Sequence, residues 1–363
     1  NKSSIEQNTA YQTIDEIRQN EISMTKKIQS HYIRILLFAY LTDDKVISLS
    51  DIIEKMDMGN NATLAENLGL SKRVLSLLNE NINKYVLSDL DYKIQDINNL
   101  SLATDMTPAE KAEMAIKRFG KLGDAVVFTP SNICDDMVNL LPDDFIKSLP
   151  EKGGKILDIA AVAGEFAVAL HKKMTNLGLN QNFISNAIYS ITKSPICYEL
   201  TKKLYNMLGL NVSNIAKQFF ATDMITDVKN VKGKTDYDKI KMLLTQNKPF
   251  DEIKLTDKVF EGEYKVKFDA VVGNPPYQGV NHSQIYPFFY LIARELSSNY
   301  ISMIFPTGWQ EPKNSNNLRN LNTNIVKQDK QIIRIDNRQN IFPSVGGAEW
   351  VNIIFWKKNY DNG

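Results

Sequence analysis

One short segment of the chain has the residue types and spacing to hold an amine nitrogen that is about to react. It reads Asn-Pro-Pro-Tyr, residues 274–277, and it directly follows the apolar stretch 268–272 and Gly273. Prolines fix the backbone and lack an N–H group, so this loop is stiff and its carbonyl oxygens stay free to accept hydrogen bonds. The side-chain oxygen of Asn274 and the carbonyl oxygen of Pro275 can together accept both hydrogens of an exocyclic amine. Held in this way, the nitrogen has its lone pair available for reaction.

Tyr277 adds a flat face next to that nitrogen. An aromatic ring can stack on a nucleobase that has been drawn out of a duplex. The alternative interpretation is that the two prolines only stiffen a surface turn. Asn-Pro-Pro-Tyr directly after Asp-Ala-Val-Val-Gly is a far more specific pattern than Pro-Pro alone. Because ligands of open parallel sheets bind at the carboxyl ends of the strands, the pattern predicts a site for an amine-bearing substrate at a sheet edge.

Short apolar strands alternate with helices around this segment. This alternation predicts an α/β fold, with a mostly parallel sheet covered by helices on both faces. A polar, Lys-rich insertion without clear periodicity occupies 223–268. The expected strands are 155–159, 187–191, 217–222, 268–272, 300–305, 331–336 and 351–356, and the expected helices are 166–170, 195–208 and 286–296.

The first part of the chain has a different pattern. Apolar residues recur at helical spacing over 14–36, and further helices are expected over 71–78 and over 107–119, where Thr107, Pro108 and Glu110 form a helix-start signature. Asn-rich stretches at 60–61, 79–83 and 98–99 are expected to mark turns. Nothing here carries chemistry. We therefore expect an α-helical N-terminal domain over 1–120, used for packing or linkage, and a catalytic domain over 121–363.

The composition limits the function classes. The 363 residues carry a net charge of +1, so the chain lacks the overall basic charge of an autonomous DNA-binding protein. Cys134, Cys197 and the three histidines are widely scattered, so we expect neither a metal site nor a disulfide framework. No apolar run is long enough to span a membrane, and a reducing, cytoplasmic location is expected. The first residue is Asn1 rather than Met, and we expect the chain to be a piece of a longer protein.

The order of these segments resembles a known family, the amino-methyltransferases of DNA, in their adenine-N6 branch of the Asn-Pro-Pro-Tyr type with a gamma-like motif order. The resemblance covers about residues 105–360. It implies the S-adenosylmethionine-dependent methyltransferase fold, with a mostly parallel seven-stranded sheet, and S-adenosylmethionine as the cofactor. Ile304-Phe305-Pro306-Thr307 is similar to the segment that follows the catalytic loop in this family.

The resemblance also implies site residues. A flipped adenine would stack between Tyr277 and Phe342, with its amine at Asn274 and Pro275. Taken singly, Phe-Thr-Pro at 128–130 is a chance match as often as not, Asp223 is equally compatible with a helix cap, and Phe342 with a core contact. The implied catalytic residues are Asn274, Pro275, Pro276, Tyr277 and Phe342, and the implied cofactor-binding residues are Phe128, Thr129, Pro130, Asp158, Ala160, Gly164, Phe166, Thr192 and Asp223, with no metal ligand.

Two positions depart from the family pattern. The loop after the first strand usually has an earlier glycine where this chain has Val162. The second strand usually ends in an acidic residue that binds the ribose hydroxyls, and Thr192 stands there instead. A threonine makes one neutral hydrogen bond in place of a charged bidentate contact, which costs on the order of 1 kcal/mol. Glu165 and Glu199 are the candidates to substitute for the missing acid.

The function implied by the resemblance is methyl transfer from S-adenosylmethionine to the N6 amine of adenine in double-stranded DNA, as the modification part of a restriction–modification system. The expected partners are DNA and covalently linked or associated nuclease, helicase and target-recognition parts, the last of which we expect to lie outside this chain. Two alternatives stay open. The same loop could serve another amine, in a protein glutamine or an RNA base. Val162 and Thr192 also fit a non-catalytic methyltransferase-fold module for DNA binding or assembly.

Overall fold

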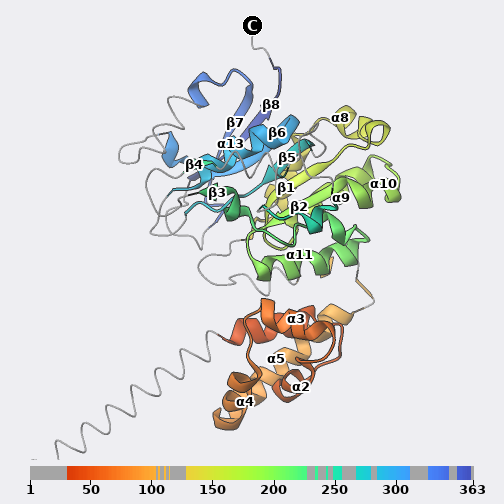
Figure 1. Cartoon of the computed structure of the whole chain (residues 1–363), viewed down its shortest axis with the longest axis vertical. Helices are drawn as coiled ribbons and strands as arrows, with labels where there is room; N and C mark the ends of the chain where they lie inside the picture. The colour runs from red at the N-terminus through yellow and green to blue at the C-terminus, as the bar shows by residue number, and fades with distance from the viewer. Residues whose placement is uncertain are drawn as a thin grey trace, which may run out of the picture. The chain divides into compact units, whose positions relative to one another are not determined.

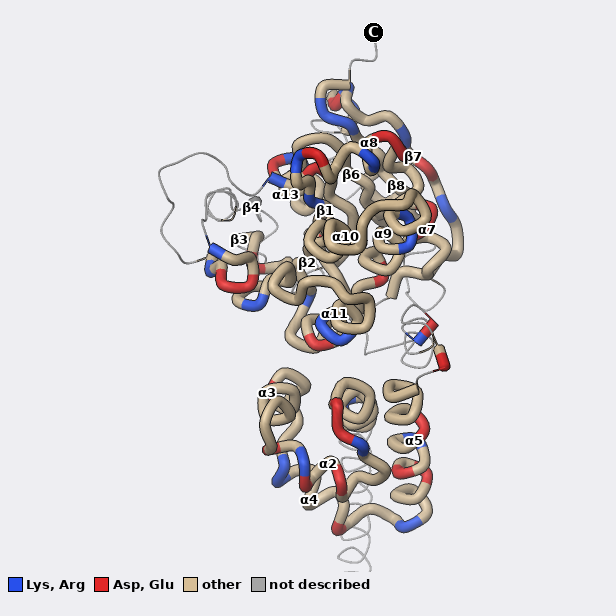
Figure 2. The backbone as a smooth tube through the Cα atoms, turned by 90° about the vertical axis from the view of Figure 1, so that its right-hand side faces the viewer, with Lys and Arg blue, Asp and Glu red and all other residues tan. Residues whose placement is uncertain are grey.

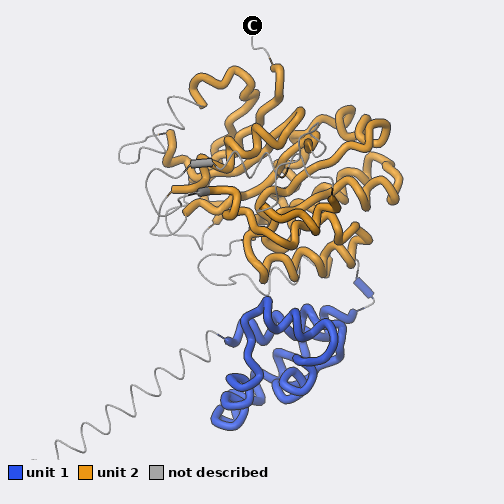
Figure 3. The backbone as a smooth tube through the Cα atoms, viewed as in Figure 1, with its two compact units in different colours: residues 1–107 blue, residues 108–363 orange. Residues whose placement is uncertain are grey.

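The computed structural model describes residues 31–103, 105–106, 110–111, 114, 128–226, 234–235, 243, 248–255, 267–278, 284–310, 326–342 and 350–360. The chain divides into two compact units, Asn1–Thr107 and Pro108–Gly363 (Figure 3). Most of the helix expected over 107–119, and the apolar pattern over 14–30, lie outside the described residues.

The smaller unit is helical wherever it is regular (Figure 1). Residues 31–41 form a helix, and Ser48 and Asn83 cap two later helices by accepting hydrogen bonds from the backbone of Asp51 and Tyr85. The later helices are α2 (Leu49–Lys55), α3 (Asn60–Asn67), α4 (Lys72–Asn81) and α5 (Lys84–Leu102).

The turns expected at 60–61 and 98–99 are wrong, because the first pair begins α3 and the second lies within α5. Asn98 is buried there, and its side chain donates to the carbonyl oxygens of Ala39 and Asp44 and accepts from the backbone N–H of Val46. The asparagine thus joins the helix to an earlier loop instead of ending it.

The larger unit contains the α/β alternation. Its helices α11 and α13 have the predicted bounds, and α11 begins with the Ser194 cap and Pro195 and ends at Gly209 in the left-handed conformation. Its helices are α7 (Ser131–Asn139), α8 (Asp143–Ser148), α9 (Glu165–Asn176), α10 (Gln181–Ala187), α11 (Pro195–Leu208) and α13 (Tyr286–Leu296). Its main strands are β1 (Ile156–Ala161), β2 (Ile188–Thr192), β5 (Phe268–Gly273), β6 (Ser297–Pro306), β7 (Ile332–Gln339) and β8 (Trp350–Lys357).

These strands form a six-stranded sheet in the order β2-β1-β5-β6-β8-β7. The first four run parallel, and β8 pairs antiparallel with both β6 and β7. Within the described ranges the sheet thus has one strand fewer than predicted. In place of the strand expected over 217–222 there is an isolated parallel bridge between Ser190 and Ile215, followed by the 3₁₀ helix η3 (Ala221–Met224). A separate pair, β3 (Ile225–Thr226) and β4 (Lys234–Thr235), is antiparallel.

Each face of the sheet has its own hydrophobic core. Phe289, Ile292 and other side chains of α13 pack on one face, together with Leu157 and Val271 from the strands. Helices α7 and α9 pack on the opposite face, and α9 contacts β1, β2 and α7. Because both faces are covered, the sheet edge at the strand ends is where a ligand can reach backbone and polar groups.

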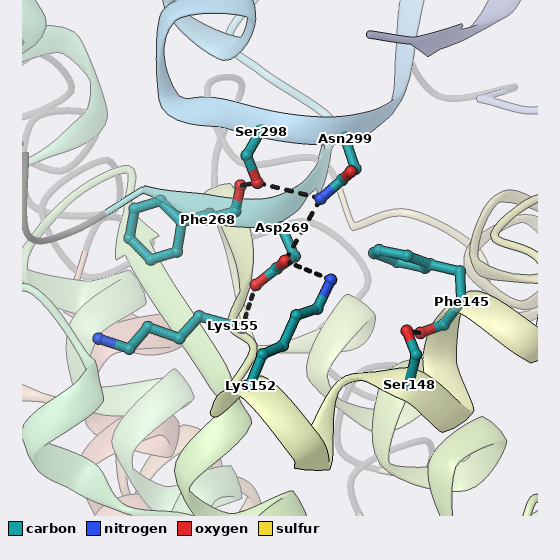
Figure 4. A network of polar contacts seen from close by, with 8 residues as sticks. All are labelled: Phe145, Ser148, Lys152, Lys155, Phe268, Asp269, Ser298 and Asn299. Carbon is teal, nitrogen blue, oxygen red and sulfur yellow. Dashed lines mark hydrogen bonds and ion pairs between the residues drawn. The ribbon is translucent and has the colours of Figure 1, made fainter.

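The amino end of β5 is held by a network of paired polar groups (Figure 4). The carboxylate of Asp269 accepts from the backbone N–H of Lys155 at 2.9 Å and from Asn299 Nδ2 at 3.3 Å, and it forms an ion pair with Lys152 Nζ at 3.0 Å. This one side chain therefore ties together the starts of β1, β5 and β6, and neither of its oxygens is left unpaired.

Charged residues of both signs are interspersed along the described backbone (Figure 2). No described helix combines the length and the apolar character needed to cross a membrane.

Candidate active site

The carboxyl ends of β1 and β5 lie side by side. Asp158 of β1 is in register with Val272 of β5, and Asn274 follows two residues later. Between them, Gly273 has φ 152°, and a Cβ built there would lie 3.2 Å from Asp158 Oδ1 and 3.1 Å from Ile159 Cγ2. Glycine therefore lets the backbone of β5 approach Asp158 closely. The 274–277 segment begins directly beside this carboxylate.

Asn274 is buried, and only one of the two polar atoms of its amide has a hydrogen-bond partner. Its exposed fraction is 5%, and its Nδ2 donates to Thr129 Oγ1 at 3.1 Å. Its Oδ1 is buried and has no hydrogen-bond partner. An unsatisfied buried acceptor costs about 1–3 kcal/mol. An incoming N–H group would satisfy it.

The two aromatic residues predicted to enclose a base are in contact. The ring centroids of Tyr277 and Phe342 lie 6.4 Å apart with an interplanar angle of 73°, and Tyr277 also meets Tyr286 edge to face at 6.2 Å. Burial raises the pKa of Tyr277, whose hydroxyl has no hydrogen-bond partner. A base stacked between two rings needs parallel planes about 7 Å apart, twice a contact of about 3.5 Å. In this arrangement one ring must turn before a base can enter.

Pro275 is buried and Pro276 is half-buried between Asn274 and Tyr277. The backbone carbonyl of Tyr277 accepts from the N–H of Ile285, which anchors the far end of the segment. The loop is thus held at both of its ends.

Glu165 joins two of the predicted cofactor segments. Its Oε1 accepts from the backbone N–H of Thr129 at 3.2 Å, and its Oε2 accepts from the backbone N–H of Ala163 at 2.9 Å. It is the first residue of α9, where the helix dipole favours a negative charge, and its exposed fraction is 6%. The sequence predicts Glu165 only as a possible substitute for the missing acid. Its bridging role has no local sequence signal.

Asp158 is fully buried with one oxygen unused. Its Oδ1 accepts from the backbone N–H of Ala160 at 3.3 Å, and its Oδ2 has no partner. Burial, and then the nearby charge of Glu165, raise the pKa of Asp158 well above its ordinary value. Burial also lowers the pKa of Lys193, against the opposing charges of Glu165 and Asp158. Lys193 was not predicted, and it is the cationic side chain whose charge most bears on Asp158. A second cation placed beside Asp158 would stabilise its ionised form.

The loop after β1 turns at Gly164, which has φ 83° and precedes α9. A Cβ there would clash with Leu204 Cδ2 of α11, so the glycine suits both the left-handed conformation and the close packing. Val162 is buried and lies outside the left-handed region, so its backbone conformation does not itself require a glycine. Ala160 and Phe166 are both buried, and Phe166 packs in the core under the sheet.

Of two residues predicted to contact the cofactor, Thr192 is buried and Asp223 is exposed. Thr192, at the end of β2, is fully buried and its Oγ1 has no partner. Asp223 is exposed, and its Oδ2 accepts from the backbone N–H of Phe220 at 2.8 Å, which caps η3. The structure therefore gives Asp223 the capping role that was its alternative. The possible substitute Glu199 is buried and lies 3.7 Å from Lys202 Nζ.

The segment 128–130 leads directly into α7. Phe128 and Thr129 are buried, and the carbonyl of Pro130 accepts from the N–H groups of Ile133 and Cys134. The structure thus brings Thr129, Asp158, Gly164 and Asn274 to one end of the sheet. In the described ranges, no group of three or more His, Cys, Asp or Glu side chains could hold a metal ion.

A family model and a relative that match this chain are both described as methylases. Residues 186–342 match the family model of the Eco57I restriction-modification methylase. An "uncharacterized adenine-specific methylase" of Mycoplasma pneumoniae is 24% identical over 306 residues, which cover 69% of this chain and 71% of the relative.

Two solved structures share the fold. The DrdV–DNA complex aligns with 92% of this chain at a TM-score of 0.51 and 13% identity. A nuclease-deletion mutant of the Type ISP restriction-modification enzyme LlaGI, in complex with a DNA substrate mimic, also aligns with 92% at a TM-score of 0.50 and 14% identity. The chain spans 36% of the DrdV chain and 30% of the LlaGI chain.

The larger unit has the fold of S-adenosylmethionine-dependent methyltransferases, and its polar groups fit that cofactor. The cofactor carries an ammonium group and ribose hydroxyls as donors. Asp158 Oδ2 is a buried acceptor without a partner at the strand ends, and Thr192 Oγ1 is another. The chain is thus similar to the methyltransferases of restriction–modification systems, with an Eco57I-type methylase match over residues 186–342, and S-adenosylmethionine is the cofactor that this similarity implies.

Proposed function

We propose that the protein transfers a methyl group from S-adenosylmethionine to the N6 amine of an adenine in double-stranded DNA. The single observation that carries this proposal is the buried, unpartnered Oδ1 of Asn274 beside Asp158. A neutral amide oxygen in a stiff loop suits a neutral exocyclic amine, which donates two hydrogen bonds.

Asn274 Oδ1 accepts one amine hydrogen and the carbonyl of Pro275 accepts the other. The base ring stacks on Tyr277, and Phe342 contacts its other face once one ring has turned. The bound cofactor would supply a methyl group on a sulfonium: the sulfur–carbon bond breaks as the nitrogen–carbon bond forms, S-adenosylhomocysteine is the leaving group, and the methylated nitrogen loses one proton to solvent. Positioning the nitrogen is the main catalytic contribution of these side chains, and it requires no general base of ordinary pKa.

Asp158 and Thr192 would hold the cofactor at the ends of β1 and β2. The free Oδ2 of Asp158 accepts from the cofactor's donor groups, and the positive charge of the cofactor favours the ionised carboxylate. Phe128 and Phe166 contribute apolar surface from the two flanking segments. Gly164 allows the loop after β1 to turn into α9.

We further propose that the protein is the modification part of a restriction–modification system and works with DNA-recognition and cleavage parts outside the described residues. The net charge of +1 supports this division, because a domain that binds DNA alone is usually basic. The DrdV and LlaGI chains, which share the fold, are about three times as long.

The test is methyl transfer from tritiated S-adenosylmethionine to unmethylated genomic DNA by the full-length protein, followed by digestion to nucleosides. The expected product is N6-methyladenine, and Asn274→Ala is expected to abolish the label. Label on another base, on RNA or on protein would assign the loop to a different amine. Undiminished labelling by Asn274→Ala would refute the role of this residue.

A non-catalytic module predicts a different result. Calorimetry with S-adenosylmethionine would then show no binding, whereas the proposed enzyme binds it in competition with S-adenosylhomocysteine.

A further inference from the structure

An asparagine amide can present either of two ends to a substrate. Only the oxygen can accept a hydrogen bond from an amine, and rotation of the amide by half a turn would put the NH₂ group there instead. Pro275 and Pro276 stiffen the backbone beside Asn274, but they do not set the rotation of its side-chain amide. Another group must choose the end that faces the substrate.

Thr129 contacts the nitrogen end of this amide. Its Oγ1 accepts from Asn274 Nδ2 at 3.1 Å, across 145 positions of sequence. Both side chains are buried, with exposed fractions of 3% and 5%, so water does not compete for this contact. With Nδ2 turned toward Thr129, Oδ1 faces the other way and remains unpartnered.

Thr129 is itself held in position. Its backbone N–H donates to Glu165 Oε1 at 3.2 Å, while the other oxygen of Glu165 accepts from Ala163 in the loop after β1. The carboxylate therefore fixes the Thr129 backbone to the cofactor loop. The side chains of Glu165 and Thr129 thus connect the loop after β1, the segment 128–130 and the 274–277 loop.

We propose that Thr129 is a positioning residue that orients the Asn274 amide for methyl transfer, and that Glu165 anchors Thr129 in this role. The inference rests on the proposed function and adds a role to Thr129 beyond the cofactor contact expected for it. It implies that removing the Thr129 hydroxyl impairs the chemical step more than it impairs cofactor binding.

The test compares Thr129→Val, Thr129→Ser and Asn274→Ala in the full-length protein. Valine keeps the shape but cannot accept a hydrogen bond, so kcat is expected to fall on the order of 10-fold while the KM for S-adenosylmethionine stays within about 2-fold. Serine keeps the hydroxyl and is expected to restore kcat. Ser302→Ala is the matched control, because Ser302 is a buried residue whose hydroxyl donates to Met137 in the core of the same unit. This control should change the melting temperature and leave kcat unaltered.

Glu165→Gln gives a second test if Thr129→Val folds poorly. The glutamine amide keeps only one acceptor oxygen, so it can hold Thr129 or Ala163 but not both. We expect a smaller loss of kcat, and less than additive loss when Thr129→Val is combined with it.

Normal kcat for Thr129→Val, with Asn274→Ala inactive, would overturn the inference and leave the proposed function standing. Equal changes in kcat and in the KM for the cofactor, or failure of serine to restore kcat, would also overturn it. An active Asn274→Ala would instead refute the proposed function itself.

Discussion

The rings of Tyr277 and Phe342 meet edge to face, with centroids 6.4 Å apart and planes at 73°. This contact holds the two rings together in the absence of a base, and insertion of a base must replace it with stacking. The contact between the rings is worth about 0.5–1.5 kcal/mol, and stacking of a base on one aromatic ring about 1–3 kcal/mol. Replacing the ring contact with base stacking is therefore favourable, but the gain in free energy is small.

Tyr277→Ala should accordingly weaken use of DNA by about 5- to 150-fold in kcat/KM, since stacking on the ring is lost. Tyr277→Phe should stay within a few-fold of the original protein, because the hydroxyl makes no hydrogen bond. Labelled methyl transfer to genomic DNA measures both. Equal activities of the alanine and phenylalanine variants would exclude a stacking role.

Asp158→Asn should stabilise the protein without cofactor at neutral pH and weaken cofactor binding. The folded-state pKa of Asp158 is raised, so its contribution to stability is fully present below the unfolded pKa of about 3.8 and is lost as pH rises through the folded value. The uncharged variant avoids this loss. Melting temperatures should therefore differ more at pH 8 than at pH 4, and calorimetry at pH 8 should show reduced affinity for S-adenosylmethionine. A difference in melting temperature that does not change with pH would contradict the assignment.

Gly164→Ala should destabilise the larger unit more than Gly178→Ala does. The two glycines have similar φ values of 83° and 77°, so the strain on a Cβ in the left-handed region, about 1–2 kcal/mol, is shared. At Gly164 the Cβ also clashes with Leu204 Cδ2, whereas nothing lies within 4 Å at Gly178. The extra overpacking should cost about 1–3 kcal/mol in the free energy of unfolding. Urea denaturation of the two variants measures the difference, and equal losses would refute the packing role.

Asn352→Leu should raise the free energy of unfolding by about 1–3 kcal/mol. Asn352 is fully buried in β8, in register with Phe305 of β6 and Asn337 of β7, and neither atom of its amide has a hydrogen-bond partner. An apolar side chain of similar size removes that penalty. Asn337→Leu is the control, because Asn337 lies on the edge strand and accepts from Gln310 at 3.2 Å. Destabilisation by Asn352→Leu would indicate an unrecognised partner for its amide.

Local patterns predicted most of the elements of the larger unit. The helix over 195–208 carries its own start and stop signals in Ser194, Pro195 and Gly209, and its bounds are confirmed. The strand expected over 217–222 failed for a physical reason. Asp223 accepts from the N–H of Phe220 and a 3₁₀ turn satisfies the backbone locally, so pairing with β2 is limited to the bridge at Ile215.

The candidate site was predictable only in part. The 274–277 loop has a local signature, and its place at the end of a strand is confirmed. The bridge from Glu165 through Thr129 to Asn274 joins residues 36 and 145 positions apart, and each of these contacts depends on the packing of the sheet. Likewise, Val162 departs from the family pattern without backbone strain, which a comparison of residue types alone does not reveal.

Strand β5 begins beside Asp269, whose oxygens are all paired, and ends beside Asn274, whose oxygen is not. A library of random variants can be sorted separately for expression and for methylation. The kind of loss should then change along the six residues of β5. Losses at the first end would appear as less folded protein with a normal specific activity. Losses at the other end would appear as abundant protein with reduced methylation. The two ends of this one strand would thus affect protein yield and specific activity separately.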